Sequence, residues 1–258
     1  MIYFLADAHL GSRLNKDPRS HELKVVRWLD MVKKDATCIY LLGDIFDFWF
    51  EYRTVVPKGF VRLLGKLAEI TDAGIEVHFF IGNHDLWTFG YLEQEIGLQV
   101  HHEPLIVEHH GKWFFMTHGD NFVDSGKSFR ILRSVFHSKI AQQLFSLLPP
   151  YLGQHFGYNW SKHNRNRLYD DRKNCFSKPA IWEELPYLRF AENYQSTPPI
   201  DFFVFGHRHV DVNRTLSNGA NLTILGDFIK IFSYGIFDGE KMELRRFENE
   251  ERITKNEE

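Results

Sequence analysis

The sequence predicts a fold in which a mixed β-sheet carries helices on its outer face. In the first hundred residues, short apolar runs typical of buried strands alternate with helical patterns. After residue 120 the strand pattern stops for about eighty residues, and it returns toward the carboxyl end. Five apolar runs lead directly into short blocks of Asp, His, Asn and Gly. These observations indicate a strand-and-helix core that is interrupted by a helical insertion.

The amino-terminal part is predicted to alternate strands and helices. The predicted strands are residues 2–6, 37–42 and 75–81. Between them, apolar residues recur at helical spacing, as in Leu23, Val26, Trp28, Leu29 and Val32 of the first helix and in residues 60–70 of the second. Gly74 stands where a glycine commonly ends a helix.

Shorter strands follow from about residue 98, with a hairpin turn expected at His110-Gly111-Lys112. The later predicted strands are 201–205, 210–216, 221–226, 230–237 and 241–247. Residues 248–258 are almost all charged or polar, which predicts a disordered tail. The core is therefore assigned to residues 1–120 and 200–247.

The insertion, residues 121–199, is predicted to be a helical cap. Apolar residues recur at helical spacing until Pro149-Pro150 ends the run, and further helices are expected near 158–174 and 179–194. Because the insertion falls between the fourth and fifth polar blocks, it should lie beside them. This position suits a lid that selects the substrate.

Charge is distributed unevenly along the chain. The net charge is −3, yet residues 121–180 contain ten Lys and Arg against three Asp. A basic segment on an acidic body favours an anionic partner, such as phosphate groups, nucleic acid or a lipid surface. A basic face that is merely solvated is the alternative.

Composition limits the cellular setting. No apolar run approaches the ~20 residues that cross a bilayer, and the chain enters a strand at once, which predicts no signal peptide. The two cysteines, Cys38 and Cys175, do not form a disulfide framework. We therefore expect a protein of the reducing cytoplasm.

The polar blocks after the strands carry the expected chemistry. They are Asp7-Ala8-His9, Gly43-Asp44, Gly82-Asn83-His84-Asp85, His118-Gly119-Asp120 and Gly206-His207-Arg208-His209. Strand ends can bring such distant residues to one rim of a mixed sheet. The Asp, His and Asn side chains, without Cys, suit hard or borderline divalent cations.

The blocks can be divided between two metal ions. Asp7 and His9 are two apart on an extended segment and point the same way, and Asp44 has two oxygens that can bridge. The predicted ligands are Asp7, His9, Asp44 and His209 for one ion, and Asp44, Asn83, His118 and His207 for the other. Two divalent ions leave such a site positive, which predicts a two-metal hydrolase acting on phosphate.

In this order the blocks D-x-H, G-D, G-N-H-D, H-G-D and G-H-x-H resemble the calcineurin-like metallophosphoesterase superfamily, over residues 1–120 and 200–247. The resemblance implies an α+β fold, a four-layer αββα sandwich of two mixed β-sheets. It also implies a dinuclear metal site at the strand ends.

A narrower resemblance covers nearly the whole chain. The run GDIFDFW at 43–49 and the stretch 118–149 are similar to the UDP-2,3-diacylglucosamine hydrolases of lipid A biosynthesis. That family implies Mn²⁺, attack on the α-phosphorus of the UDP moiety, and release of UMP and 2,3-diacylglucosamine 1-phosphate. It implies a cap that holds both acyl chains. Ser161, Lys162 and Arg165 lie within about one turn of each other on a predicted helix and are predicted to contact the sugar hydroxyls and the phosphate; the family has a Ser-Lys at a similar place, with different spacing downstream.

One residue departs from that family. Its better-known members have Arg after the metal-binding Asn, whereas this chain has His84. A His paired with Asp85 could stabilise the leaving group, so both residues are predicted to be catalytic. Asn83, His84 and His207 are expected to contact substrate as well. Because a His can also protonate an alkoxide, a phosphodiesterase or nuclease with the same metals stays open.

The expected partners follow from these resemblances. The substrate is predicted to be a UDP-linked, diacylated glucosamine rather than a nucleic acid, and no protein partner is inferred. The basic, aromatic insertion is expected to rest on the anionic inner face of the inner membrane, as peripheral proteins do. A non-catalytic scaffold is disfavoured because every expected ligand residue is present.

Overall fold

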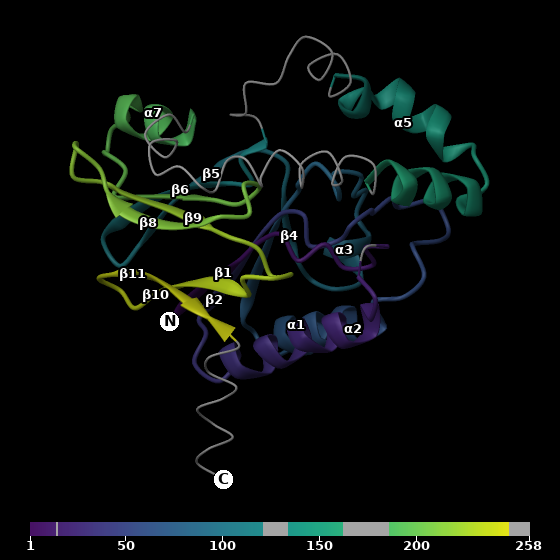
Figure 1. Cartoon of the computed structure of the whole chain (residues 1–258), viewed down its shortest axis with the longest axis horizontal. Helices are drawn as coiled ribbons and strands as arrows, with labels where there is room; N and C mark the ends of the chain where they lie inside the picture. Colours follow the sequence, from purple (N-terminus) through teal and green to yellow (C-terminus); the bar gives the residue numbers. More distant parts are fainter. Residues whose placement is uncertain (14, 121–133, 162–185, 248–258) are drawn as a thin grey trace.

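Two β-sheets pack face to face between layers of helices (Figure 1). The structure, a computed structural model, describes residues 1–13, 15–120, 134–161 and 186–247. Within these residues, the first sheet has the strand order β11 (Met242–Arg246), β10 (Ser233–Phe237), β1 (Ile2–Leu5), β2 (Cys38–Leu42), β3 (Glu76–Phe80) and β4 (Gln99–His101). The second has the order β5 (Leu105–His109), β6 (Lys112–Thr117), β7 (Phe202–Phe205), β9 (Asn221–Leu225) and β8 (Asp211–Thr215).

Both sheets are mixed, and their parallel strands set the direction of the molecule. β1, β2, β3 and β4 are parallel in the first sheet, and β6, β7 and β9 are parallel in the second. Antiparallel neighbours β10 and β11 flank the first group, while β5 and β8 flank the second. Each group of parallel strands therefore has its carboxyl ends along one edge.

Apolar layers join the sheets to each other and to the helices. Phe4 and Tyr40 of the first sheet meet Phe114 and Val204 of the second in the space between them. The helices α1 (Pro18–Val32) and α2 (Val61–Asp72) cover the outer face of the first sheet, and α7 (Pro186–Asn193) covers that of the second. This order of layers confirms the predicted αββα sandwich.

The buried face of α1 differs from the predicted one. Leu23 and Val26 are partly exposed, while Val25, His21 and Glu22 are buried. The His21 Nε2 atom donates a hydrogen bond of 2.7 Å to a main-chain carbonyl, and Glu22 Oε1 accepts from two amides at the start of α2. These hydrogen bonds compensate for the burial of both side chains, and those to Glu22 satisfy amides that the start of α2 would otherwise leave unpaired.

The hairpin that was predicted at residues 110–112 joins β5 and β6, and the helix α5 (Lys139–Ser146) ends before Pro149, as expected. A second helical segment spans 150–161. Residues 162–185, in which parts of the predicted helices 158–174 and 179–194 fall, and the tail 248–258 lie outside the described residues.

The position of α7 changes the expected boundary of the insertion. Tyr187, Leu188 and Ala191 are buried against Phe203 and Phe205 of the second sheet, so α7 is an outer layer of the sandwich. Within the described part, the segment that stands away from the sheets is 134–161 (Figure 1). We therefore propose that the cap, predicted as 121–199, ends before α7. No described helix is long and apolar enough to cross a membrane.

Candidate metal centre

The carboxyl ends of the parallel strands bring the polar blocks to one rim. Asp7 and His9 follow β1, Asp44 follows β2, Asn83 follows β3, His118 follows β6, and His207 and His209 follow β7. Two groups of potential ligands result: Asp7, His9 and His209 in one, and Asp44, His118 and His207 in the other, with the ligand atoms of each group within 4.8 Å of one another. The sequence blocks are thus neighbours in space.

The backbone at this rim adopts a conformation that side-chain-bearing residues rarely use. Asp7, His9, Asp44, His207 and His209 have φ angles of 53°, 46°, 53°, 68° and 50°. Such left-handed conformations cost about 1–3 kcal/mol each and persist where the surrounding structure enforces them. Their concentration among five predicted ligands indicates that the fold is organised around this site.

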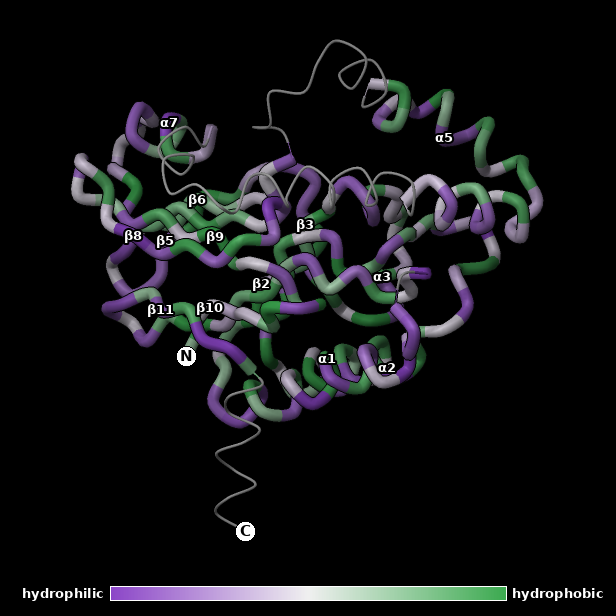
Figure 2. Tube along the Cα trace, in the orientation of Figure 1, coloured by the Kyte–Doolittle hydropathy of each residue, from purple (hydrophilic) through white to green (hydrophobic). Residues whose placement is uncertain are grey.

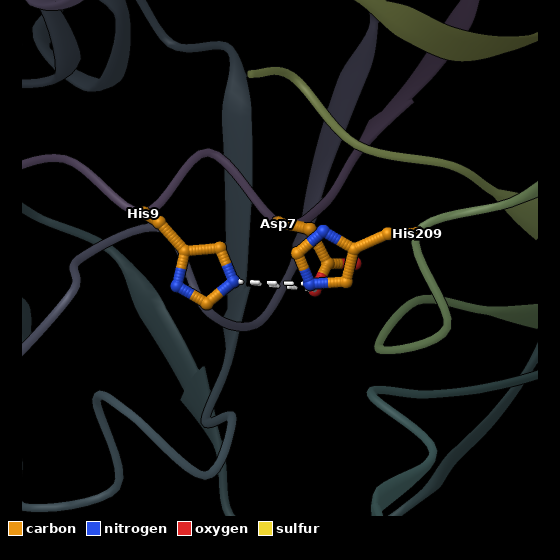
Figure 3. A group of neighbouring side chains, drawn as sticks. All are labelled: Asp7, His9 and His209. Atoms are coloured by element: carbon orange, nitrogen blue, oxygen red, sulfur yellow. Dashed lines mark hydrogen bonds and ion pairs between the residues drawn. The ribbon is translucent and has the colours of Figure 1, made fainter. Parts of the chain in front are cut away.

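Figure 3 shows the first group, in which two imidazole rings face each other beside Asp7. The Nε2 atoms of His9 and His209 are 3.3 Å apart, and Asp7 Oδ1 lies 3.7 Å and 3.3 Å from them, respectively. Donor atoms that lie about 2.0–2.2 Å from a shared divalent ion are roughly 3–3.5 Å from each other. The spacing of these three atoms is therefore that of ligands around one ion.

The far nitrogen of each ring has a polar neighbour. His9 Nδ1 lies 3.5 Å from Asp47 Oδ1, and His209 Nδ1 lies 3.6 Å from Asp227 Oδ2. Acceptors at Nδ1 favour a proton there and leave lone pairs on both Nε2 atoms. Two lone pairs 3.3 Å apart repel each other unless a cation lies between them, so the arrangement favours a metal ion.

Asp44 connects the two groups. Its Oδ2 atom lies 3.5 Å from His9 Nε2 and 3.4 Å from His118 Nε2. Its other oxygen accepts a hydrogen bond of 2.9 Å from the main-chain amide of His84, and His118 Nδ1 donates to the carbonyl of Leu42. A carboxylate oxygen shared between both groups is the feature that a bridging ligand requires.

Two buried oxygens provide an independent test of whether a cation fits. Asp7 Oδ1 and Asn83 Oδ1 are buried without a hydrogen-bond donor among the described residues. An unsatisfied buried acceptor costs about 1–3 kcal/mol, whereas a bound cation would satisfy it. Carboxylate, amide and imidazole donors suit a divalent ion of the hard or borderline class. The residues present therefore fit a metal centre.

Burial and mutual charge perturb the titration of these groups. Burial raises the pKa of Asp7 to about 6. Burial opposes ionisation of Asp44 and His118 as well, but the attraction between them holds the pKa of Asp44 well below, and that of His118 well above, the ordinary values. A cation can replace the imidazolium proton as the positive partner of Asp44. Metal binding should therefore release protons and weaken as the pH falls.

The loops that present the ligands are fixed by one buried carboxylate. Asp85 accepts hydrogen bonds from the main-chain amides of Gly82, Asp44, Ile45 and Phe46, at 2.7–3.2 Å. A Cβ atom on Gly82 would overlap Asp44, so only glycine allows this approach. Asp85 thereby locks the loop after β3 onto the loop after β2.

Comparison with known proteins agrees with this geometry. Residues 1–211 match the family model described as calcineurin-like phosphoesterase. A UDP-2,3-diacylglucosamine hydrolase of Porphyromonas gingivalis is 40% identical over 259 residues, which cover 97% of this chain and 98% of that protein. The enzyme of the same name from Vibrio cholerae (strain N16961) is 25% identical over 80% of each chain.

This chain belongs to the UDP-2,3-diacylglucosamine hydrolase family of calcineurin-like phosphoesterases. It is therefore a hydrolase with a metallophosphoesterase domain, as predicted, and the family implies divalent metal ions at the rim. The predicted roles of individual rim residues remain predictions, which the geometry above supports.

One predicted pairing in this hydrolase is wrong. His84 was expected to pair with Asp85, but His84 Nδ1 instead donates a hydrogen bond of 2.9 Å to the main-chain carbonyl of Asp47. Asp85 is fully buried and occupied by four amides, so it positions loops rather than contacting substrate. His84 itself lies beside the centre, with its ring centroid 4.7 Å from that of His9, and one of its nitrogens lies within 4.8 Å of a nitrogen of His9 and a carboxylate oxygen of Asp44.

A small cavity adjoins the centre beneath the cap. Asn83 and His84 line it on the side of the rim, and Ser161 lines it from the end of the 150–161 helix. The remaining walls are mostly aromatic or apolar: Phe48, Leu86, Trp87, Phe136, Phe156, Gly157 and Trp160, together with Asp47. Ser161, a predicted substrate contact, is thus beside the rim. Lys162 and Arg165, the other two, lie outside the described residues.

The sequence did not predict the two carboxylates that lie beside the Nδ1 atoms of His9 and His209, which are Asp47 and Asp227, respectively. Asp227 accepts from the amides of residues 229–231, and it follows β9 in a Gly-Asp block. Although burial opposes ionisation, the contact with His209 and these amides lower the pKa of Asp227 to about 2. Gly226-Asp227 repeats the pattern of Gly43-Asp44 after an apolar strand, so this pattern could have identified it.

Proposed function

We propose that this hydrolase cleaves the pyrophosphate of UDP-2,3-diacylglucosamine by attack on the α-phosphorus. The products are UMP and 2,3-diacylglucosamine 1-phosphate. The single observation that carries the proposal is the position of the cation-binding rim directly beside an aromatic cavity under the cap. The name of the relative that is 40% identical over nearly the whole chain supports the same substrate.

The proposed centre holds two divalent ions, with Mn²⁺ as the native metal. Asp7, His9, Asp44 and His209 would hold one, and Asp44, Asn83, His118 and His207 would hold the other. When bound, the ions would polarise phosphoryl oxygens and stabilise the negative charge that develops as the P–O bond breaks.

His84 is the proposed contact for the leaving phosphate. Its Nδ1 proton is used by the carbonyl of Asp47, so its Nε2 atom is the one left for substrate. The residue lies where the rim meets the cavity. A phosphate leaving group is a weak base that needs charge stabilisation more than full protonation, and a hydrogen bond from His84 can provide this, as can the Arg of other family members.

The cap is proposed to recognise the lipid part. Trp87, Phe136, Phe156 and Trp160 line the cavity, whose volume of about 40 Å³ is too small for an acyl chain, so the chains are proposed to lie along the apolar surface of the cap outside it. Ser161 is placed to bond sugar hydroxyls, and Lys162 and Arg165 are proposed to approach the phosphate. A nuclease would instead need an open, basic groove along a nucleic acid backbone.

Mass analysis of the products decides the proposal. Purified, Mn²⁺-loaded protein should convert UDP-2,3-diacylglucosamine to UMP and the lipid 1-phosphate, with ¹⁸O from water appearing in UMP. Deacylated substrate should react far more slowly. Equal turnover of both substrates, or ¹⁸O in the sugar phosphate, would contradict it, and turnover of a nucleic acid that falls steeply with salt would favour the nuclease.

Contact with an anionic membrane surface is proposed for the exposed face of the cap. Ile140, Leu147 and Tyr151 are 71%, 78% and 76% exposed, although each is large and apolar or aromatic. Vesicles with an anionic leaflet should sediment the protein, and Leu147→Ser should reduce that binding. Membrane contact would be contradicted if the unchanged protein and Leu147→Ser stayed in the supernatant to the same extent whether or not vesicles were present.

A further inference from the structure

A second cluster of possible metal ligands lies at the opposite end of β2 and β3. Cys38 is the first residue of β2 and Glu76 is the first residue of β3, and the parallel register pairs them directly. His78 is two residues farther along β3, on the same face as Glu76. One sulfur, nitrogen or oxygen atom from each of the three lies within 4.8 Å of the other two.

The imidazole of this cluster is held in one orientation. His78 Nδ1 and His101 Nε2 share a hydrogen bond of 2.8 Å across β3 and β4, and the Tyr40 ring stacks on His78 at 4.5 Å between centroids. His78 Nε2 is the nitrogen on the side of Glu76, 3.7 Å from its Oε2 atom. A ring whose far nitrogen is bonded while the near one faces other donors is the usual setting of a metal-binding histidine.

The donor set differs from that of the rim. Burial raises the pKa of the Cys38 thiol to about 12, so the thiolate would form only as the ion binds. Thiolate, carboxylate and neutral imidazole then carry a total charge of −2, which a divalent ion neutralises. Cys38 and His78 are buried, whereas Glu76 is 63% exposed, so an ion can enter from the Glu76 side. Sulfur and nitrogen donors select Zn²⁺ over Mn²⁺ or Mg²⁺, and three protein ligands leave a position for water.

We propose that Cys38, Glu76 and His78 form a zinc site that is separate from the catalytic centre. Asp44 lies six residues beyond Cys38 along the strand direction, about 20 Å at roughly 3.3 Å per residue, so the two sites share no ligand. The ion would link the starts of the two strands whose other ends carry Asp44 and Asn83. Its role would be to fix their register.

Cobalt provides a spectroscopic test, because a thiolate bound to Co²⁺ gives a charge-transfer band in the near ultraviolet and the rim contains no cysteine. The full chain loaded with Co²⁺ should show this band. Cys38→Ser should abolish it, while the control Cys175→Ser should keep it. Absence of the band in the unchanged protein, or its survival in Cys38→Ser, would overturn the proposal.

Metal content gives a second measurement that does not depend on the cysteine. Equilibrium dialysis against Zn²⁺ should show one ion fewer per chain in His78→Gln than in the unchanged protein. Glu76 is exposed, so Glu76→Gln should fold normally and bind this zinc about tenfold or more weakly. Turnover by the Mn²⁺-loaded rim should stay unchanged in Glu76→Gln. Unaltered zinc affinity in that folded variant would overturn the site.

Discussion

The rim and the cap are built in opposite ways. The rim takes its side chains from the ends of parallel strands, and Asp7, His9 and His118 are almost completely buried. The cap instead exposes apolar side chains along α5 and residues 150–161. Apolar and polar positions alternate along these segments in Figure 2. The backbone of the sandwich therefore positions the candidate metal ligands of this hydrolase, whereas the proposed contacts with the acyl chains lie on a layer that packs on its surface.

The two regions meet on an aromatic platform. Phe48, Phe50 and Trp87 of the core form a cluster against which Phe136 and Phe145 of the cap pack. Two hydrogen bonds also join the regions. Trp87 Nε1 donates a hydrogen bond of 2.9 Å to the main-chain carbonyl of Phe136, and the Arg13 guanidinium donates one of 2.6 Å to Asn159 Oδ1. Substitutions can therefore be chosen that affect one region and leave the other intact.

The largest effect is expected at the rim. Asp44→Ala removes the carboxylate that both ligand groups share, so turnover should fall about a thousandfold or more while the fold is retained. Product release from UDP-2,3-diacylglucosamine and far-ultraviolet circular dichroism measure the two quantities. Asp72→Ala, an exposed change at the end of α2, serves as the matched control. Undiminished turnover in Asp44→Ala would refute the centre.

A smaller effect is expected from the carboxylate behind the rim. Asp227→Asn keeps the size of the side chain but loses the charge that faces His209 Nδ1, which should weaken metal affinity about 10–100-fold. Competition with a chelator measures the affinity, again with a change at Asp72, Asp72→Asn, as control. Equal affinity in all three proteins would show that Asp227 does not support the centre.

The next change perturbs the contact between cap and core. A Cβ atom on Gly157 would overlap the Phe48 ring, and such overpacking typically costs about 1–3 kcal/mol. Gly157→Ala should therefore raise KM for the diacylated substrate about tenfold while leaving metal affinity unchanged.

Gly65→Ala is the control for that variant, because nothing lies near a Cβ atom at this exposed position of α2. It should stabilise the protein by up to about 1 kcal/mol and leave KM unaltered. A KM for Gly157→Ala equal to that of the unchanged protein would mean that the packing of the cap on Phe48 does not shape substrate binding.

The smallest effect is expected on the outer layer, away from both regions. Partial burial raises the pKa of Asp30, but hydrogen bonds from Lys33 and Lys66 outweigh this and lower it in the native state. A depressed native pKa adds stability above the unfolded value of 3.8, and this stability is lost as the pH falls through the native value.

Asp30→Asn should accordingly reduce the free energy of unfolding at pH 7 by less than about 1 kcal/mol and have less effect at pH 3. Urea denaturation at both values measures this, and turnover should not change. A larger loss at pH 3 than at pH 7 would contradict the assignment.

Much of the fold could be predicted because it depends on local patterns. Apolar runs such as 37–42 located the strands, and the polar blocks after them located the rim, because the carboxyl ends of parallel strands meet. The positions of Asp7 and His207 followed from the same rule.

Contacts between distant segments could not be predicted in this way. Glu22 was not expected to be buried, because its two amide partners belong to a helix that begins about forty residues later. The partner of His84 was assigned to the adjacent carboxylate, whereas the structure selects a carbonyl 37 residues earlier. The aromatic side chains of α7 gave no indication of whether they would join a cap or the sandwich.

The distance along the sequence between facing ligands has a consequence for how the protein is made. His9 and His209 are 200 positions apart, and β10, which pairs with β1, comes later still. Neither group of candidate ligands is therefore complete until the segment that follows β7 has been synthesised and has packed beside the loops after β1 and β2. Because His207 and His209 are proposed ligands, a fragment that ends before residue 207 should bind divalent ions much more weakly than this chain does.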